Sequence, residues 1–530
     1  MQLRQAILAA AVALILPAPG LRAEVLALVI GIDRYDHIPD LNGAVNDALD
    51  IADAHSALPG AKVTTLLNHE ATRARILANW TDMADRARPG DSIVVTFAGH
   101  GSFEPATEDA TEDDGRDETF LLSGFAPEGP GAGERIRDDE VARLIARSPG
   151  IPVILVADSC HSGTATRATG FDLAYRFFDP GGLRGDPLPP PPRMSRDEAA
   201  AARQSLTFFA AVDEAEKAPE IPIDGAVRGA LSYAFAAGLR GAADSDADGI
   251  VAKGELERYI RRFVRQATAG RQTPVVDPPG GRDQPLFRLP GTGGPEPPPA
   301  PFARDFDALP VLPIRSEGAV ASGPILRTLD GARVAAPGED DIATLVVDLE
   351  RRHIRSAQGD ILRRLFGRSD AGFRRQIQDT VDKFRAIRAI QAAQLDETLE
   401  IWFPLGDALY FADDPVKLMV DGRQDPHLSL FNITSDATVE WLYPVTAGDS
   451  PTPDPGAALA LEVFVLPPFG ADHLVAIETP EPQDAVLRAL NRHDGGFDFR
   501  AFWTDMHHAL RDRPHRVAVH AFFTHRPGDR

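Results

Sequence analysis

The sequence of 530 residues is poor in cysteine, in basic residues and in long apolar runs. Its single cysteine excludes an internal disulfide framework, so stability must come from apolar burial and bound metal. Lysine and arginine number 55 against 78 acidic residues, and the resulting charge of −23 disfavours nucleic acid and anionic membranes as partners. No stretch approaches the ~20 apolar residues of a membrane span, so we expect no integral membrane segment in the mature chain.

The first 23 residues have the pattern of a cleavable secretory signal peptide. Arg4 precedes the apolar segment from Ala6 to Leu16, and a Pro-Ala-Pro-Gly break follows before Ala23. A buried helix of an intracellular domain is the alternative, but the order of the break and the small residue favours a signal peptide. The segment has no cysteine, which excludes a lipid anchor attached to one. We expect cleavage after Ala23 and a secreted protein, periplasmic or extracellular.

Strand-like and helix-like segments alternate over residues 24–290, which predicts an α/β fold with a mostly parallel sheet flanked by helices. Residues 291–305 are rich in proline and glycine and are expected to form a linker. Over residues 306–530, a helix-rich segment and then short strand-like runs predict a C-terminal β-sandwich-like domain with helical insertions.

A further proline-rich stretch lies inside the α/β part, within residues 179–204. Such a sequence favours extended, solvated chain. Several arginines lie in or near it, so we expect residues 179–204 to form a flexible, cleavable loop.

The sequence places one histidine and the only cysteine directly after two strand-like runs. Ala-Gly-His-Gly contains His100, and Asp-Ser-Cys-His-Ser-Gly contains Cys160. In an open α/β sheet, reactive groups gather beyond the carboxyl ends of the strands. A thiol attacks a carbonyl as thiolate, which an imidazole can generate, so Cys160 and His100 are a candidate nucleophile and base. His161 competes with His100, but neighbouring residues leaving a strand tend to point apart. The backbone N–H groups of Gly101 and Cys160 are candidates for an oxyanion hole.

These motifs resemble those of the caspase and metacaspase family, and the cysteine motif is similar to its metacaspase form. The resemblance covers roughly residues 24–290 and includes Leu41-Asn-Gly-Ala-Val-Asn-Asp-Ala48. It implies a Cys160/His100 dyad and a specificity pocket lined by Asp47 and Asp158. Buried paired carboxylates are costly unless a cation enters, so we expect cleavage after Arg or Lys and self-processing in the 179–204 loop.

Two acidic segments are candidate calcium sites. Residues 108–118 are placed like the acidic calcium loop of metacaspases, although a solvated loop explains them equally well. The second segment matches an EF-hand loop at every acidic position and at its glycine. Its expected ligands are Asp244, Asp246, Asp248, the backbone carbonyl of Ile250, and Glu255.

The combined features predict a secreted cysteine endopeptidase with protein or peptide substrates, calcium as the only cofactor and no organic cofactor. One alternative is a catalytically idle caspase-like scaffold whose C-terminal domain binds an unknown partner. Another is a calcium-binding adhesion module, but the internal repeats expected of such proteins are missing.

Overall fold

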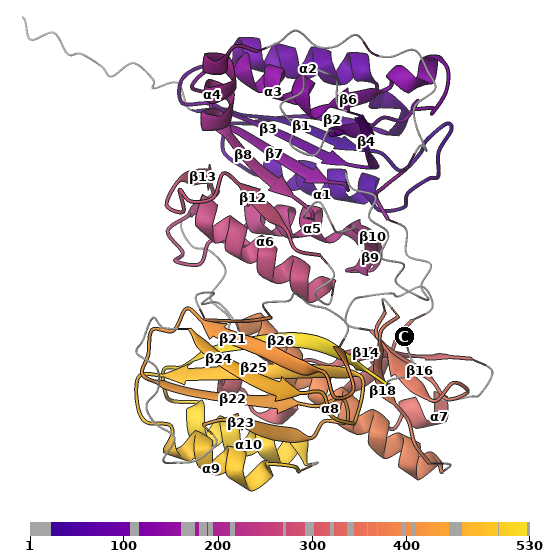
Figure 1. Ribbon diagram of the computed structural model, residues 1–530, viewed down its shortest axis with the longest axis vertical. Helices are drawn as coiled ribbons and strands as arrows, with labels where there is room; N and C mark the ends of the chain where they lie inside the picture. The colour runs from indigo at the N-terminus through magenta and orange to yellow at the C-terminus, as the bar shows by residue number, and fades with distance from the viewer. Residues whose placement is uncertain are drawn as a thin grey trace, which may run out of the picture.

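The computed structural model describes most of the chain, in two halves stacked along its long axis (Figure 1). The described residues are 23–105, 116–160, 175–179, Leu188, 194–212, 218–268, 272–291, 301–318, 323–336, 344–357, 359–367, 369–393, 399–403, 410–444, 458–496 and 498–526. The expected signal peptide, His161 and most of the acidic segment 108–118 lie outside them. Among the described helices, none has the length and apolar character needed to cross a membrane.

A six-stranded sheet of order β12-β8-β7-β3-β1-β2 forms the centre of the N-terminal half. It is parallel except at its β12 edge, as the alternating sequence pattern predicts. Its strands are β1 (Val25–Gly31), β2 (Ala61–Leu67), β3 (Ser92–Ala98), β7 (Val153–Asp158), β8 (Leu206–Ala210) and β12 (Val275–Asp277). All residues of β7 are buried, because helices cover both faces of the sheet.

Helices cover the two faces of this sheet as separate layers (Figure 1). The first face packs against α2 (Arg73–Arg86), α3 (Asp138–Ala146) and α4 (Arg196–Ser205). The second packs against α1 (Ala44–Ser56), α5 (Ala230–Ala237) and α6 (Lys253–Ala267). Alternate residues of β1 divide between the two cores, with Leu28 on the first face and Val29 on the second.

Three small sheets surround this framework near its ends. Their strands are β4 (Gly101–Pro105), β5 (Arg116–Leu121), β6 (Arg135–Arg137), β9 (Glu220–Ile223), β10 (Ala226–Gly229), β11 (Ile250–Ala252) and β13 (Pro285–Arg288). They pair as β4-β5-β6, β9-β10 and β11-β13. The first of them begins directly after His100, and β10 ends at the start of α5.

The end of the expected 179–204 loop is helical. Helix α4 begins after Ser195, whose side chain accepts a hydrogen bond from the N–H of Glu198 while Glu198 bonds back to Ser195. This reciprocal cap satisfies N–H groups that the first helical turn leaves open, and an alanine run follows it. The prediction of a loop was therefore wrong for residues 196–204.

The C-terminal half is β-rich, and its first unit is a mixed five-stranded sheet of order β15-β14-β16-β17-β18. Its elements are β14 (Leu312–Glu317), α7 (Gly323–Leu326), β15 (Ala332–Val334), β16 (Leu345–Asp348), β17 (His353–Arg355), β18 (Ile361–Arg364) and α8 (Asp370–Ala393). The sequence predicted that a helix-rich segment comes first in this half, but three strands, β16, β17 and β18, precede the long helix α8. Leu345-Val-Val is fully buried beside β14, and this packing outweighs the helix-forming residues nearby.

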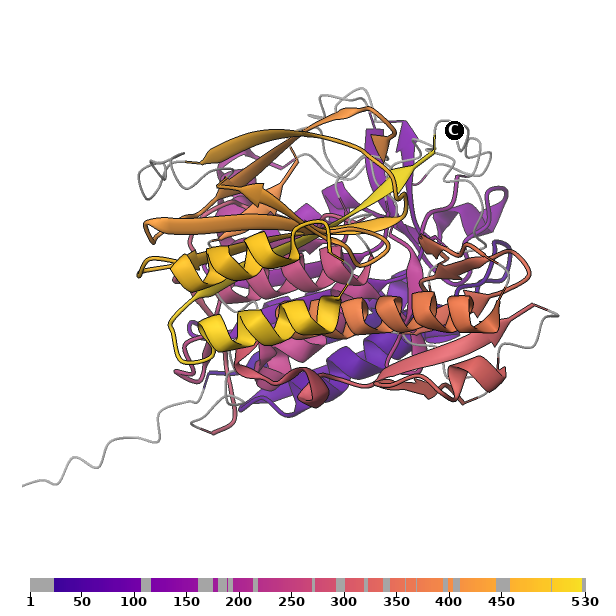
Figure 2. The ribbon, with the colours of Figure 1, turned by 90° about the horizontal axis from the view of Figure 1, so that it is seen from below.

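The second unit has two facing sheets and a layer of helices. A three-stranded sheet, β19-β21-β24, shares an apolar core with one face of the five-stranded sheet β20-β26-β25-β22-β23. The strands are β19 (Glu400–Trp402), β20 (Tyr410–Phe411), β21 (Pro415–Asp421), β22 (His427–Ile433), β23 (Val439–Tyr443), β24 (Leu459–Phe464), β25 (Ala471–Thr479) and β26 (Arg516–His525). Helices α8, α9 (Asp484–His493) and α10 (Phe499–Leu510) cover the other face (Figure 2).

This unit begins before residue 306. Phe302 is fully buried, and its ring centroid lies 4.8 Å from that of Trp503 on α10. The expected linker over 291–305 therefore ends earlier, because its last residues pack into the C-terminal core.

Candidate active site

The sheet register brings the two motifs to the same edge. Ala98 at the end of β3 pairs with Asp158 at the end of β7. His100 and Cys160 each follow two residues later, and neighbouring strands lie about 4.8 Å apart. The residues of the predicted dyad therefore emerge side by side at the carboxyl edge of the sheet.

His100 is buried and held in one orientation. Its backbone N–H donates to the hydroxyl of Tyr35 at 2.8 Å, and its Nε2 lies 2.9 Å from the carbonyl oxygen of Pro39. A carbonyl only accepts, so Nε2 carries the hydrogen and Nδ1 keeps its lone pair. Among the described residues Nδ1 has no hydrogen-bond partner. Burial lowers the pKa of His100 to about 4, so the imidazole is neutral at physiological pH and can accept a proton at Nδ1.

Gly99 allows this arrangement. A Cβ atom at Gly99 would lie 2.8 Å from the hydroxyl oxygen of Tyr35. A side chain there would displace the hydroxyl that orients His100. The sequence motif suggested the need for glycine beside His100 but gave no sign of Tyr35, which is 65 residues away in the chain.

Cys160 is fully buried beneath another segment of the same chain. Its Sγ accepts a hydrogen bond from the backbone N–H of Ala218. Its own N–H donates to the carbonyl oxygen of Arg176 at 3.1 Å. The N–H of Gly101 donates to the same oxygen at 3.0 Å. The two N–H groups predicted as an oxyanion hole thus converge on one carbonyl, which is the arrangement that stabilises negative charge on a carbonyl oxygen.

The side chain of Arg176 fills a pocket of three carboxylates. Its guanidinium bonds to Asp47, and lies 3.1 Å from Asp158 and 3.3 Å from Glu220. The arginine, Asp47 and Asp158 side chains are wholly inaccessible to solvent, and that of Glu220 nearly so. Burial alone would lower the pKa of Arg176, but the three carboxylates hold it well above its ordinary value. The structure thus joins Asp47 and Asp158, and adds Glu220, which the sequence did not indicate.

Backbone N–H groups at two helix starts support these carboxylates. Glu220 accepts from the N–H of Gly43 at 2.8 Å, just before α1, and Asp158 accepts from Ser232 at 2.8 Å in the first turn of α5. Helix N-termini favour negative charge. Burial raises the pKa of Asp47, while the Arg176 guanidinium acts in the opposite direction. The pocket is therefore built for a cation.

Gly229 leaves the space that this pocket requires. A Cβ atom there would lie 2.2 Å from Oδ2 of Asp158 and 2.5 Å from Nη1 of Arg176. The backbone N–H of Gly229 also donates to Asp47 at 3.1 Å. Any other residue would displace both the carboxylate and the guanidinium.

The chain around Arg176 lies extended across the two motifs. The N–H of Arg176 donates to the carbonyl of Ala218 at 3.2 Å, and Tyr175 forms an antiparallel bridge with Pro219. On the other side, the N–H of Phe178 donates to the carbonyl of Gly101 at 3.1 Å. The segment is thus held by backbone bonds on both sides of the Arg176 carbonyl, as a bound peptide would be.

Two aromatic side chains follow Arg176, and each contacts another aromatic ring. The rings of Phe177 and Phe103 are stacked, with centroids 6.2 Å apart. Those of Phe178 and Phe125 meet edge to face at 6.4 Å. The side chains after the Arg176 carbonyl therefore have defined contacts as well.

Comparison with known proteins agrees with this geometry. Residues 26–169 match the family model described as metacaspase, peptidase C14 domain. This part of the chain is metacaspase-like. Metacaspase-1 of Plasmodium falciparum is 33% identical over 164 residues, which cover 28% of this chain and 25% of that protein. Metacaspase-1A of Aspergillus oryzae is 30% identical over 169 residues, which cover 30% of this chain and 38% of that protein. The chain thus spans well under half the length of these relatives.

The metacaspase match indicates a cysteine-type peptidase domain and includes both His100 and Cys160. Among solved structures, a Geobacter sulfurreducens protein aligns with a TM-score of 0.36 and 22% identity, covering 50% of this chain and all of that one. The residues of the metacaspase-like site beyond the match, Arg176 and Glu220, come from the structure alone.

The EF-hand-like segment, residues 244–255, runs into the first turn of α6. Carboxylate oxygens of Asp244, Asp246 and Glu255 lie within 4.8 Å of one another. Asp248 stands outside this group, and its Oδ1 accepts from the N–H of Ile250 at 2.7 Å. The structure thus gathers three of the predicted ligands, all with hard oxygen donors of the kind that calcium prefers.

Proposed function

We propose that this protein is a cysteine endopeptidase that cleaves after arginine, with lysine a weaker substrate, and that it cleaves its own chain between Arg176 and Phe177. The observation that supports this most strongly is the docking of Arg176. Its carbonyl oxygen meets the N–H groups of Gly101 and Cys160, and its side chain meets three carboxylates. A residue before a scissile bond would be held in the same way.

In the proposed reaction, Nδ1 of His100 takes the proton of the Cys160 thiol. The thiolate bonds to the carbonyl carbon of the arginine in the pocket, and the N–H groups of Gly101 and Cys160 stabilise the oxyanion. The bond to the next residue breaks as the imidazolium returns its proton to the leaving amine. Water then hydrolyses the thioester, which releases the new carboxylate and restores the thiol.

The shape of the pocket favours arginine over lysine. The planar guanidinium of Arg176 reaches Asp47 and Glu220 through Nη2 and Asp158 through Nη1. A lysine ammonium is a single point charge, so at least one of the three buried carboxylates would be paired more weakly.

Self-processing is proposed three residues before the loop that the sequence indicated. The docked segment around Arg176 occupies the site, so a separate substrate can bind only after this segment has left. We therefore expect the protein to be synthesised in an inhibited form that is relieved by cleavage after Arg176 or by release of the segment.

Mass spectrometry of purified protein, compared with Cys160→Ala, tests this proposal. We expect a fragment beginning at Phe177 in the wild type and an intact chain in Cys160→Ala. Arg176→Lys should be cleaved more slowly, and Arg176→Ala should not be cleaved there. Exposed Arg86→Ala serves as the control. A Cys160→Ala chain that still cleaves itself would refute the nucleophile, and an intact wild type with no activity on arginine peptides would favour the scaffold alternative.

We further propose that Asp244, Asp246 and Glu255 hold a structural calcium ion, with Asp248 and the carbonyl of Ile250 joining when it binds. Burial and then the neighbouring carboxylates raise the pKa of Asp244, so a cation would be favourable there. Thermal unfolding with calcium and with chelator tests this. Wild type should gain stability with calcium and Glu255→Gln should gain much less; equal gains would contradict the site.

Secretion by way of the first 23 residues remains part of the proposal. The apolar segment from Ala6 to Leu16 and the break after it support it. Sequencing the mature N-terminus and fractionating the producing cells test it. A mature chain that begins at Glu24 outside the cytoplasm is expected, and a full-length chain in the cytoplasm would contradict it.

A further inference from the structure

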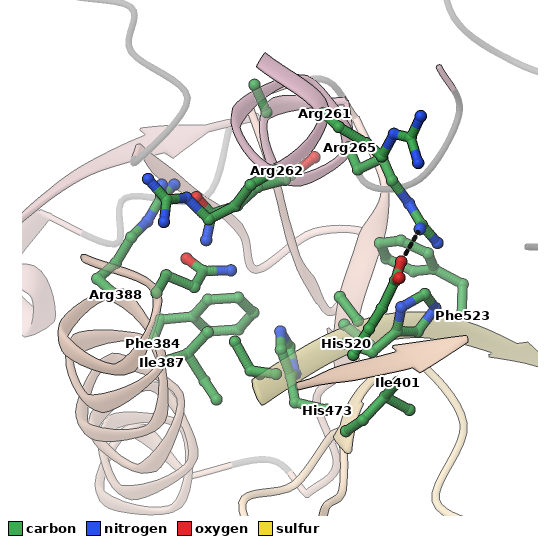
Figure 3. Close-up of a pocket in the computed structure, with 18 of the residues that line it drawn as sticks. Arg261, Arg262, Arg265, Phe384, Ile387, Arg388, Ile401, His473, His520 and Phe523 are labelled. Atoms are coloured by element: carbon green, nitrogen blue, oxygen red, sulfur yellow. Dashed lines mark hydrogen bonds and ion pairs between the residues drawn. The ribbon is translucent and has the colours of Figure 1, made fainter. Parts of the chain in front are cut away.

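A cavity of about 540 Å³ lies between α6 and the C-terminal half (Figure 3). None of the described residues that line it belongs to the two catalytic motifs. Helix α6 forms one wall, and α8, β19, β25 and β26 form the opposite side. Cavities of this size hold small organic molecules. The Arg265 guanidinium, 3.1 Å from Glu400 of β19, joins the two sides at the edge.

The C-terminal side contributes nearly all of the apolar residues that line the cavity. Phe384 and Ile387 come from α8, Ile401 from β19 and Phe523 from β26. Figure 3 shows Phe384 and Ile387 beside the open space on the α8 side. Such a floor favours the apolar body of a ligand.

The α6 side of the cavity is basic in a chain that is acidic overall. Six arginines line the cavity, four of them on α6, against four carboxylates. The arginines are Arg258, Arg261, Arg262, Arg265, Arg282 and Arg388. Figure 3 shows Arg262 of α6 and Arg388 of α8 extending toward the same side of the cavity. Arginine forks bind carboxylate and phosphate groups, so this side favours an anion.

His473 provides a polar group in the floor. Its side chain is only 3% exposed, and within the described part of the chain its Nδ1 has no hydrogen-bond partner. Burial, followed by the nearby charges of Lys383 and Arg388, lowers its pKa well below the ordinary value. A neutral imidazole can donate or accept one hydrogen bond at Nδ1, and Figure 3 shows the ring directed into the cavity.

We propose that this cavity binds a small amphipathic anion, with a carboxylate or phosphate head beside Arg262 and Arg388 and an apolar body against Phe384, Ile387 and Phe523. The site is separate from the peptidase chemistry. Its ligand would contact both halves of the protein at once and would hold α6 against the C-terminal half.

Fluorescence titration with 11-(dansylamino)undecanoate, on full-length Cys160→Ala protein, tests this site. The fluorescence emission of the probe should shift to shorter wavelength when it binds. Decanoate or decyl phosphate should displace the probe, while decanol at the same concentration should not. The better competitor of the two anions identifies the preferred head group. Arg262→Gln/Arg388→Gln should weaken binding about tenfold or more, since each lost pairing is charge-assisted. Arg147→Gln, an exposed arginine on the far helix layer, should bind as the parent does.

Thermal unfolding of each variant verifies that the fold is kept. No saturable binding, equal displacement by decanol, or unchanged affinity in the double variant would overturn the proposal. Activity on peptides plays no part in this readout, so failure of the proposed peptidase function would leave it unaffected.

Discussion

Asp158→Asn is the substitution that most directly probes the cation pocket. The carboxylate lies 3.1 Å from the Arg176 guanidinium, and both side chains are inaccessible to solvent. At that separation and an effective dielectric constant of about 20, the attraction is about 5 kcal/mol before desolvation is counted. Truncating one partner of a buried charge pair costs about 2–5 kcal/mol. In kcat/KM for an arginine peptide, this corresponds to a loss of about 30-fold to about 5000-fold.

The substitution is conservative in shape. Asparagine keeps an oxygen that can accept from the N–H of Ser232, so the start of α5 should stay intact. The assay is hydrolysis of matched fluorogenic peptides ending in Arg or Leu, by protein that has been processed. Asp50→Asn is the control, because Asp50 lies on the same helix as Asp47 but is 24% exposed and pairs with Arg228. A partly exposed pair should change activity by less than about fivefold.

The result that would refute the pocket is a loss in Asp158→Asn no larger than that in Asp50→Asn. An equal loss for the Arg and Leu peptides would instead indicate damage to the dyad, which lies two residues away. Thermal unfolding of both variants separates these outcomes from general destabilisation.

Three further predictions concern the same site. Burial lowers the pKa of His100 to about 4, and the imidazole must be neutral to act as the base. The value of kcat/KM should therefore stay constant from neutral pH down to about pH 5 and fall below that, and a fall centred near pH 6.5 would contradict this prediction. Gly229→Ala should abolish cleavage after arginine in the peptide assay, since its Cβ would lie 2.2 Å from Asp158, and retained activity would refute that clash. Phe103→Ala removes one ring contact, so it should lower kcat/KM about threefold to tenfold for peptides with phenylalanine after the arginine. Peptides with glycine at that position should be cleaved as before, and equal effects on the two peptides would refute the contact.

The sequence was sufficient to predict the catalytic edge of the sheet but not the pocket around it. His100 and Cys160 follow apolar strands and Asp158 ends one of them, and parallel strands bring such positions together by register. Glu220 and Arg176 carry no comparable local pattern. They reach the site only because β9 and the docked segment fold back over it, and contacts of this kind depend on tertiary packing.

The C-terminal half shows the same limit at the level of secondary structure. Strand β22 was predictable because Leu428, Leu430, Phe431 and Ile433 make it a short, mostly apolar run. Strands β16 to β18 were missed because each has only three or four residues, and neighbouring charged helix formers obscured them. Short strands of this kind are defined by their partners in the sheet rather than by their own residues.

Cleavage after Arg176 has a consequence for stability. Burial raises the pKa of Asp47 above its ordinary value of about 4, and the Arg176 guanidinium opposes that rise. If Arg176 leaves the pocket after processing, the folded protein binds more protons than the unfolded chain between about pH 4 and the raised pKa of Asp47. Its unfolding free energy should then fall as pH rises, by up to about 1.4 kcal/mol per pH unit for one such group.

Agmatine, a small guanidinium compound, should restore the missing cation. We expect it to raise the unfolding temperature of processed protein, and to do so more at pH 8 than at pH 5, where protonated carboxyls need no partner. Unprocessed Cys160→Ala keeps Arg176 in place and should show a shallower pH dependence and little response. An equal response of the two forms would mean that Arg176 does not occupy the substrate position, because a docked arginine and agmatine compete for the same three carboxylates.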